Sequence, residues 1–317
     1  MALVARELIP SRTGFGKGLA EAGALNPKVV GLGADITASV SMNLFAERFP
    51  ERFFSMGIAE QNCVGVAAGL ALAGKIPVFS TYGVFATIRT LDQIRISLCY
   101  NNLHAIIGGA HAGISVGPDG ATHQALEDIA VMRVLPNMTV LSPCDATQAR
   151  LCTLAAIENN DGPAYIRFGR EAVPDFTDEN QTFEIGKAQL LAKGTDVTLM
   201  ATGHLVWEAC QAADILALQG ISAQVLNFHT IKPIDKAAII DAAKSTRAVV
   251  TAEEHQLMGG FGSAIAEVLV MNYPVPVEMV GINDMFGESG KPHELMLKYK
   301  LTAVDIAMAA ERAIQRK

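Results

Sequence analysis

The sequence has few of the features that mark membrane proteins and nucleic-acid-binding proteins. No apolar run in its 317 residues is long and uncharged enough for a signal peptide or a membrane span, because the N-terminal run meets Arg6 and the Ala-rich run meets Lys75. The formal charge of −7 argues against nucleic acid or an anionic membrane as the main partner. We therefore expect a globular protein that binds neither.

Cysteines and metal-binding patterns are also scarce. The five cysteines form no CxxC pair, show no metal-ligand spacing and lie in apolar segments, which predicts reduced, buried thiols and a cytoplasmic protein. The chain has no P-loop, no HExxH motif and no GxSxG nucleophile elbow. The turn nearest to a dinucleotide fingerprint is Gly-Gly-Phe-Gly at 259–262. Tight packing of a helix on a sheet explains this turn better than an anion site does.

What the sequence does contain is an alternation of short β-rich runs and helical stretches. Half of the residues are hydrophobic, which is enough for large cores, and the length suggests about two domains. The alternation predicts βαβ units, mainly parallel sheets and therefore an α/β fold. In the first half the expected strands are 29–32, 53–56, 76–80, 104–107, 138–141 and 164–167, and the expected helices include 41–49, 87–100 and 145–159. In the second half the expected strands are 196–201, 222–227, 248–252 and 277–280, with helices between them and two amphipathic helices at the end.

A polar, acidic stretch separates the two halves. Residues 173–181 are weakly periodic, so we predict a linker there. The predicted domains are therefore residues 1–175 and 185–317.

A single carboxylate stands at the start of the most apolar helix. Residues 52–74 predict a short strand that leads into a long helix rich in Ala and Gly, with Glu60 at the junction and no charge before Lys75. We expect this helix to be buried on most sides. An acid in the first turn suits the helix dipole, so Glu60 alone is best explained as a helix cap. An ionised carboxylate in an apolar interior would instead require a partner group.

The second informative stretch is residues 108–124. Its five glycines, two histidines and one aspartate predict an irregular loop after the strand that ends near 107. Loops at the carboxyl ends of strands are where α/β sheets keep their ligands. His111, Asp119 and His123 could converge on one site there, although a solvated glycine loop with incidental histidines is an equally good interpretation.

Four motifs, in order, then match one family. They are G-I-A-E-Q-N at 57–62, S-T-Y-G-V-F at 80–85, A-H-A-G at 110–113 and D-G-A-T-H-Q at 119–124. Together they resemble the C-terminal half of transketolases, and the resemblance covers essentially the whole chain. It implies a pyrimidine-binding domain, with a parallel sheet flanked by helices, followed by a smaller α/β C-terminal domain. More distant likenesses are to deoxyxylulose-phosphate synthase and to the β subunits of 2-oxo acid dehydrogenases.

The resemblance implies a set of cofactor and substrate residues. Glu60 matches the catalytic acid that hydrogen-bonds the aminopyrimidine of thiamine diphosphate, and Phe85 matches the aromatic residue that stacks on that ring. Asp35 falls where the family places an acid near the cofactor, and His123 matches a catalytic residue beside the reacting carbonyl. The residues implied to bind the sugar phosphate are Arg12, Ser39, His111, Asp119, His123 and Arg170.

One part of the family's site is missing from this sequence. Transketolases hold the diphosphate and Mg²⁺ with a GDG motif that is followed by NN. This chain has Asn159 and Asn160 but no GDG before them, and we interpret these asparagines as the polar end of a helix. The resemblance therefore implies that a separate N-terminal subunit carries GDG and NN, that this chain supplies no metal ligand, and that the two form an α2β2 heterotetramer.

The implied reaction moves a two-carbon ketol unit from a phosphorylated ketose to an aldose. The alternatives are a subunit with the chemistry of deoxyxylulose-phosphate synthase or of a 2-oxo acid dehydrogenase, and a non-catalytic regulatory subunit. His111 favours transketolase, because the synthase usually has Asp-Arg-Ala-Gly where this chain has A-H-A-G. The presence of Glu60, Phe85, His111 and His123 together argues against a silent site.

Overall fold

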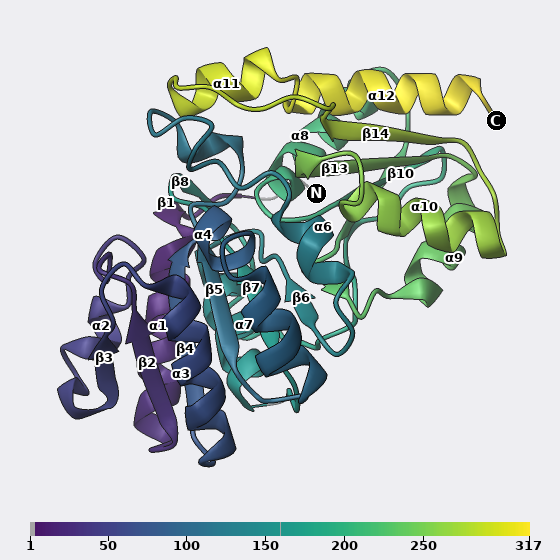
Figure 1. Cartoon of the computed structure of the whole chain (residues 1–317). Coiled ribbons are helices and arrows are strands. Elements are labelled where there is room, and N and C mark those ends of the chain that lie inside the picture. The colour runs from purple at the N-terminus through teal and green to yellow at the C-terminus, as the bar shows by residue number, and fades with distance from the viewer. Residues whose placement is uncertain (1–3, 159) are drawn as a thin grey trace.

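Two β-sheets organise the chain, and the computed structural model describes residues 4–158 and 160–317 (Figure 1). The first sheet has seven strands in the order β12-β6-β7-β5-β4-β2-β3 and is parallel apart from β12. Its central strands are continuous apolar runs because helices cover both of their faces. The strands are β2 (Val29–Gly33), β3 (Phe53–Ser55), β4 (Ile76–Tyr82), β5 (Ile106–Ala110), β6 (Thr139–Leu141), β7 (Ala164–Arg167) and β12 (Thr230–Lys232).

Helices pack on both faces of this first sheet. On one face α1 (Ser11–Leu25) packs against α7 (Ala146–Glu158), and on the other lie α3 (Glu60–Leu72) and the π-helix η2 (Ile94–Tyr100). Neighbouring strand residues alternate between the two cores, as expected for the pleat. The shorter helical segments are α2 (Asn43–Ala46), η1 (Pro50–Arg52), α4 (Gly83–Thr87), α5 (Leu91–Gln93), η3 (Ile114–Val116) and α6 (Asp128–Arg133).

The second sheet has five strands in the order β14-β13-β10-β11-β9, and only β9 is antiparallel to its neighbour. Its α9 and α10 side shares one continuous core with the α3 side of the first sheet. The α8 and α12 side has a core of its own (Figure 1). The elements are β9 (Gln189–Ala192), β10 (Val197–Ala201), α8 (Leu205–Leu218), β11 (Ala223–Asn227), α9 (Lys236–Thr246), β13 (Val249–Gln256), α10 (Phe261–Asn272), β14 (Val277–Ile282), α11 (Pro292–Lys298) and α12 (Ala303–Gln315).

Two strand pairings connect distant parts of the chain. β12, from the second half, pairs antiparallel with β6 at the edge of the first sheet. β1 (Glu7–Pro10) pairs antiparallel with β8 (Ala172–Asp175). The linker predicted at 173–181 is therefore wrong in its first part. Asp175 looked like a loop residue because it is acidic, but its carboxylate accepts the backbone N–H of Thr147 at 2.9 Å and pairs with Arg6 at 2.8 Å.

The structure confirms most of the predicted strands and helices to within a few residues and corrects three segments. The strand expected at 104–107 is observed at Ile106–Ala110. Gly108 and Gly109 belong to this strand and not to a loop. They are glycines because Phe15 and Tyr165 fill the space where a Cβ would lie. The helix expected at 41–49 shrinks to α2, since Ser41 has a left-handed backbone with φ 60°. The helix expected at 87–100 is divided into α5 and η2, after threonine hydroxyls bond back to carbonyls four residues earlier. Asn159, expected at the end of α7, lies outside the described residues.

The helix that begins at Glu60 is not buried on most sides within this chain, contrary to the prediction. Its inner face is buried, but Leu72 is 73% exposed and Ile58, just before the helix, is 74% exposed. The same outer face carries Gly65 and Gly69, where an added Cβ would meet nothing within 4 Å. An apolar sequence cannot show whether a surface is buried by its own chain or by another one. In the described residues no helix is both long and apolar enough to cross a membrane.

Candidate active site

The carboxyl ends of four neighbouring strands carry many of the residues that the sequence singled out. β3, β2, β4 and β5 are parallel neighbours, so the segments that follow them meet at one edge of the sheet (Figure 1). Glu60 follows β3, Asp35 follows β2, Phe85 follows β4 and His111 follows β5. Asp35 and His111 have left-handed backbones, with φ of 64° and 55°. Such strained residues are typical of functional sites.

Glu60 is buried and paired with a cation. It is the first residue of α3 and is 3% exposed, and its Oε1 accepts a hydrogen bond of 2.6 Å from Nη1 of Arg89. The Cζ of Arg89 lies 4.0 Å from the ring centroid of Phe85, so one guanidinium contacts both residues. Sequence reasoning missed Arg89. The signal that could have found it is its spacing of four residues from Phe85, which places the two side chains on one side of a helical turn.

Two histidines and two aromatic rings pack together beyond the end of β4. The ring centroid of Tyr82 lies 4.3 Å from that of His111 and 5.6 Å from that of His123. Phe85 lies 5.3 Å from His123 in an edge-to-face arrangement. Tyr82 is a second residue that sequence reasoning did not single out, although it is the third letter of the S-T-Y-G-V-F motif. The structure therefore brings the two histidines into contact with a single ring.

His111 is a neutral polar group in a cationic setting. It is 2% exposed, and its Nδ1 has no hydrogen-bond partner among the described residues. Burial lowers its pKa to about 3, and the nearby positive charges of Arg12 and Arg170 and the imidazole of His123 act in the same direction. The imidazole thus stays uncharged at neutral pH and can both donate and accept a hydrogen bond.

The two arginines predicted to bind a sugar phosphate both lie near His111. Arg12 is in the first turn of α1, and Arg170 follows β7. Nη1 of Arg12 donates to the backbone carbonyl of Ser39 at 2.8 Å. Nη1 of Arg170 lies 3.2 Å from Oδ1 of Asp119 and 3.3 Å from the carbonyl of Val116. The side chain of Arg170 is about one-third exposed, and its guanidinium has further N–H groups that could bind a ligand.

Asp35 stands apart from this group. It is exposed, and the described residues give its side chain no hydrogen bond or ion pair with the other predicted site residues. The contacts described above group Arg12, Ser39, Asp119 and Arg170 near His111. The role of Asp35 stays a prediction.

Comparisons with known proteins decide the family. The family model described as "Transketolase, pyrimidine binding domain" matches residues 8–175, and the one described as "Transketolase, C-terminal domain" matches residues 186–306. The chain belongs to the transketolase family. The pyrimidine-binding and C-terminal domains implied by the motifs, in an α/β fold, are confirmed.

The most informative transketolase relatives are subunits rather than whole enzymes. The chain is 45% identical over 290 residues to the 6-deoxy-6-sulfo-D-fructose transketolase subunit SqwH of Clostridium sp. (strain MSTE9), and the match covers 92% of this chain and 90% of that protein. It is 38% identical over 315 residues to one of the subunits of the apulose-4-phosphate transketolase of Phocaeicola vulgatus, with 99% and 100% covered. A solved structure described as "Split gene transketolase, inactive beta4 tetramer" is 49% identical, has a TM-score of 0.92, and covers 98% of this chain and 99% of that one.

The runner-up family is less similar. The 1-deoxy-D-xylulose-5-phosphate synthase of Desulforudis audaxviator is 36% identical over 301 residues, and the matched region is 94% of this chain but only 47% of the synthase. Transketolase, rather than the synthase, is thus the better description, and this chain is a C-terminal transketolase subunit.

The transketolase family implies dependence on thiamine diphosphate, and the residues present fit the pyrimidine part of that cofactor. Arg89 already places a flat, N–H-donating cation on the face of Phe85 and against the carboxylate of Glu60. An aminopyrimidine ring is also flat and would offer a ring nitrogen to the same carboxylate. For the metal, the described residues contain no group of three or more His, Cys, Asp or Glu side chains that could hold an ion.

Two other features lie apart from the candidate site. The glycine-rich turn before α10 is a packing turn, as predicted. The carboxylate of Glu253 accepts the N–H groups of Phe261 and Gly262 at 2.6 and 2.7 Å, and a Cβ on Gly260 would lie 2.3 Å from it. Burial raises the pKa of Glu253 to about 7. The start of this helix is therefore occupied by an acid of the chain itself.

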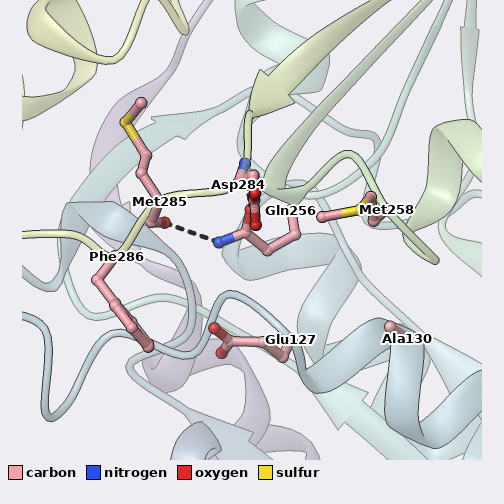
Figure 2. Close-up of a pocket in the computed structure, with 7 residues that line it drawn as sticks. All are labelled: Glu127, Ala130, Gln256, Met258, Asp284, Met285 and Phe286. Atoms are coloured by element: carbon pink, nitrogen blue, oxygen red, sulfur yellow. Dashed lines mark hydrogen bonds between the residues drawn. The ribbon is translucent and has the colours of Figure 1, made fainter.

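A cavity of about 300 Å³ is the second feature, and Figure 2 shows the residues that line it. Met258, Met285 and Phe286 give it an apolar character, and the side-chain amide of Gln256 donates to the carbonyl of Met285 at 2.8 Å. None of the site residues predicted from the sequence lines it. The cavity is therefore separate from the candidate site at the carboxyl ends of the strands.

Proposed function

We propose that this chain supplies the pyrimidine half of a thiamine-diphosphate-dependent transketolase active site, and that a separate N-terminal subunit supplies the other half. The observation that carries the proposal is the grouping of Glu60, Phe85 and Arg89, which offers a carboxylate and an aromatic face to one planar ligand. The N-terminal subunit would carry the GDG and NN motifs and hold the diphosphate and Mg²⁺. The enzyme would be a transferase of ketol groups that is active only with both subunits.

The roles of this chain's residues follow from their positions. Glu60 would share a proton with a ring nitrogen of the aminopyrimidine, as donor when Glu60 is protonated and as acceptor when the ring nitrogen is, and so determine where that proton resides. Phe85 would hold the ring flat, and Asp35 would stand near the cofactor at the end of β2. When bound, the cofactor supplies the electron sink for the transferred two-carbon unit. His123 would donate or accept a proton at the reacting carbonyl.

The substrate class is a ketose that carries an anion at its far end. Arg12 and Arg170 lie near His111, together with Ser39 and Asp119, in a setting of two guanidinium groups and a neutral imidazole. Guanidinium groups bind phosphate and sulfonate oxygens with charge-assisted hydrogen bonds. The names of two relatives describe one sulfonated and one phosphorylated ketose, which supports this class but does not choose between the two anions.

The partner surface is supported by the outer face of α3. Leu72 and Ile58 are largely exposed beside Gly65 and Gly69, which leaves an apolar, shallow face next to Glu60. We propose that a second subunit covers it in an α2β2 heterotetramer. The similar solved structure is described as an inactive tetramer of β subunits, which is in keeping with an enzyme that needs a different chain for activity.

All five cysteines are buried and free, and we propose that the protein works in the cytoplasm. We also propose that its two domains comprise residues 1–175 and 185–317.

Calorimetry tests the divided site directly. The isolated chain should bind thiamine diphosphate and Mg²⁺ negligibly, and the complex with the N-terminal subunit should bind them and transfer a ketol unit from hydroxypyruvate to an aldose phosphate. Micromolar binding of the cofactor by the isolated chain would contradict the divided site. Efficient use of pyruvate by the complex would favour the synthase chemistry instead.

A further inference from the structure

Two residues of the C-terminal domain, one buried and one about nine-tenths buried at its side chain, contact the part of the chain that carries the proposed anion-binding residues. His204 is the residue just before α8, and Glu254 lies in β13. Neither was suggested by any sequence motif. His204 contacts Ser11 and Gly169, the residues that precede Arg12 and Arg170, and Glu254 contacts the loop between His111 and Asp119.

His204 contacts the neighbours of both arginines. Its Nε2 lies 3.2 Å from Oγ of Ser11, and Ser11 is followed by Arg12. Its ring also packs against Gly169, where a Cβ would lie 1.9 Å from Cε1, and Gly169 is followed by Arg170. The backbone N–H of Gly169 donates to Oγ of Ser11 at 3.0 Å. One imidazole and one hydroxyl therefore fix the points from which the two guanidinium groups extend.

Glu254 supports the loop between His111 and Asp119. Its Oε1 accepts the backbone N–H of Ser115 at 2.5 Å. It also lies beneath Gly113, which has φ 91° and leaves no room for a Cβ, since that atom would lie 2.3 Å from Oε1. The loop begins at His111 with a strained, left-handed residue. A buried carboxylate beneath the loop keeps that conformation in place.

The two residues form one unit. Nδ1 of His204 lies 3.8 Å from Oε2 of Glu254, and the backbone carbonyl of Glu254 accepts a hydrogen bond of 2.7 Å from Arg167. Burial lowers the pKa of His204, so its ring is neutral. We assign the ring proton to Nδ1, where it faces the carboxylate of Glu254, with the Ser11 hydroxyl donating to Nε2. The order Ser, His, Glu resembles a hydrolase triad, but Ser11 is 0% exposed and cannot reach a substrate.

We propose that His204 and Glu254 are positioning residues through which the C-terminal domain sets the geometry of the anion-binding half of the substrate site. This inference rests on the proposed function, because it assigns a role in the same site. It gives the C-terminal domain a specific part in recognising the far end of the ketose, at a distance from the transferred carbons.

The test compares donors with and without a distal anion in the two-subunit enzyme. His204→Ala and Glu254→Ala should each raise KM for D-xylulose 5-phosphate about tenfold or more, while kcat and KM for hydroxypyruvate stay within about twofold of the parent. Glu254→Gln keeps an acceptor oxygen for Ser115 and should restore KM to within about threefold. If Glu254→Ala does not fold, Glu254→Asp, which withdraws the carboxylate by one methylene group, replaces it.

The matched control is Glu208→Ala. Glu208 is another partly buried acid of the C-terminal domain, but its carboxylate accepts the N–H of Ala303 at 2.7 Å, at the start of α12. Its loss should lower the melting temperature and leave the ratio of the two KM values unchanged. Equal loss of activity on both donors in the His204 and Glu254 variants, or unchanged KM values, would overturn the proposal.

A second measurement separates failure of this inference from failure of the proposed function. Hydrogen exchange in the isolated chain needs no activity. Amide exchange in residues 111–117 should be faster in Glu254→Ala than in the parent and in Glu208→Ala. If the parent complex transfers no ketol unit, the proposed function is wrong, and unchanged exchange in this segment would show that Glu254 does not position the loop.

Discussion

The guanidinium of Arg89 joins Glu60 by a hydrogen bond of 2.6 Å and at the same time lies on the ring of Phe85. The side chain of Glu60 is 4% exposed and that of Arg89 is 41% exposed, so the carboxylate is enclosed while the cation can still leave towards solvent. The chain therefore balances the buried charge of its proposed catalytic acid with a group that a ligand can displace.

Arg89→Met should destabilise the isolated chain by about 1 to 2 kcal/mol, because it leaves the carboxylate of Glu60 buried without its cation, while the exposure of Arg89 moderates the loss. Urea denaturation measures the change. Arg95→Met is the control, since Arg95 is exposed and makes no ion pair within the described residues. In the background of Glu60→Gln the effect of Arg89→Met should largely disappear. Equal effects in both backgrounds would show that the pair is not coupled.

Glu60→Gln should lower turnover of the two-subunit enzyme by about a hundredfold or more, within the range for lost proton-transfer catalysis. The change is nearly isosteric, so the melting temperature of the complex should hardly move. Steady-state kinetics with hydroxypyruvate measure the loss. Turnover within threefold of the parent would remove Glu60 from the mechanism.

Arg170→Ala should raise KM for a phosphorylated ketose tenfold to a hundredfold, because a charge-assisted contact at the distal anion contributes roughly 1.5 to 3 kcal/mol. Hydroxypyruvate has no distal anion and serves as the internal control, with kinetic constants that stay close to those of the parent. A defect of the same size with both donors would place Arg170 outside the anion site.

His123→Ala should lower kcat with every donor, whereas Arg170→Ala should raise KM for the phosphorylated donor alone. The proposed partner of His123 is the carbonyl that all donors share, so kcat should fall with hydroxypyruvate and with the phosphorylated ketose alike. The ring also packs on Phe85 and Tyr82, and His123→Phe keeps an aromatic ring there without the imidazole nitrogens. Full activity in His123→Phe would mean that His123 only packs.

His111 should make the chain less stable in acid. Its pKa is about 3 in the folded chain against an ordinary value of 6.5, so below pH 6.5 the unfolded chain takes up a proton that the folded chain does not. This destabilisation is absent above pH 6.5 and grows as the pH falls from 6.5 towards 3, by at most about 1.4 kcal/mol per pH unit. In His111→Asn the stability measured by urea denaturation should fall less between pH 6 and pH 4, whereas His293→Asn, at an exposed position, should leave the slope unchanged.

The alternation of β-rich runs and helical stretches predicted much of the fold. β10 and β11 lie where the β-rich runs at 196–201 and 222–227 predict them. The sequence pattern did not reveal β1, β8, β9 and β12, which have only three or four residues each and pair antiparallel at edges. Each is held by pairing with a strand that is distant in the sequence, and a local pattern does not report such a pairing.

Some residues of the candidate site lie in local sequence motifs, whereas others are linked to it only by contacts between distant parts of the sequence. Glu60, Phe85, His111 and His123 could be singled out in the sequence because each lies within a short motif. Arg89 and Tyr82 lie close to those motifs in sequence, but their roles depend on the direction of a side chain. Glu254 meets Ser115 across 139 positions of sequence, and no local pattern in a single sequence reports such a contact.

The pairing of β12 with β6 means that the two domains of this chain are not independent modules. A strand from the second half closes the edge of the first sheet, and one hydrophobic core extends from α3 to α10. Removing the C-terminal domain would uncover the edge of β6 and the part of that core on which the domain packs, and an uncovered strand edge can pair with other chains. A chimera that exchanges C-terminal domains between relatives would therefore have to carry β12 and its approach to β6 as part of the exchanged unit.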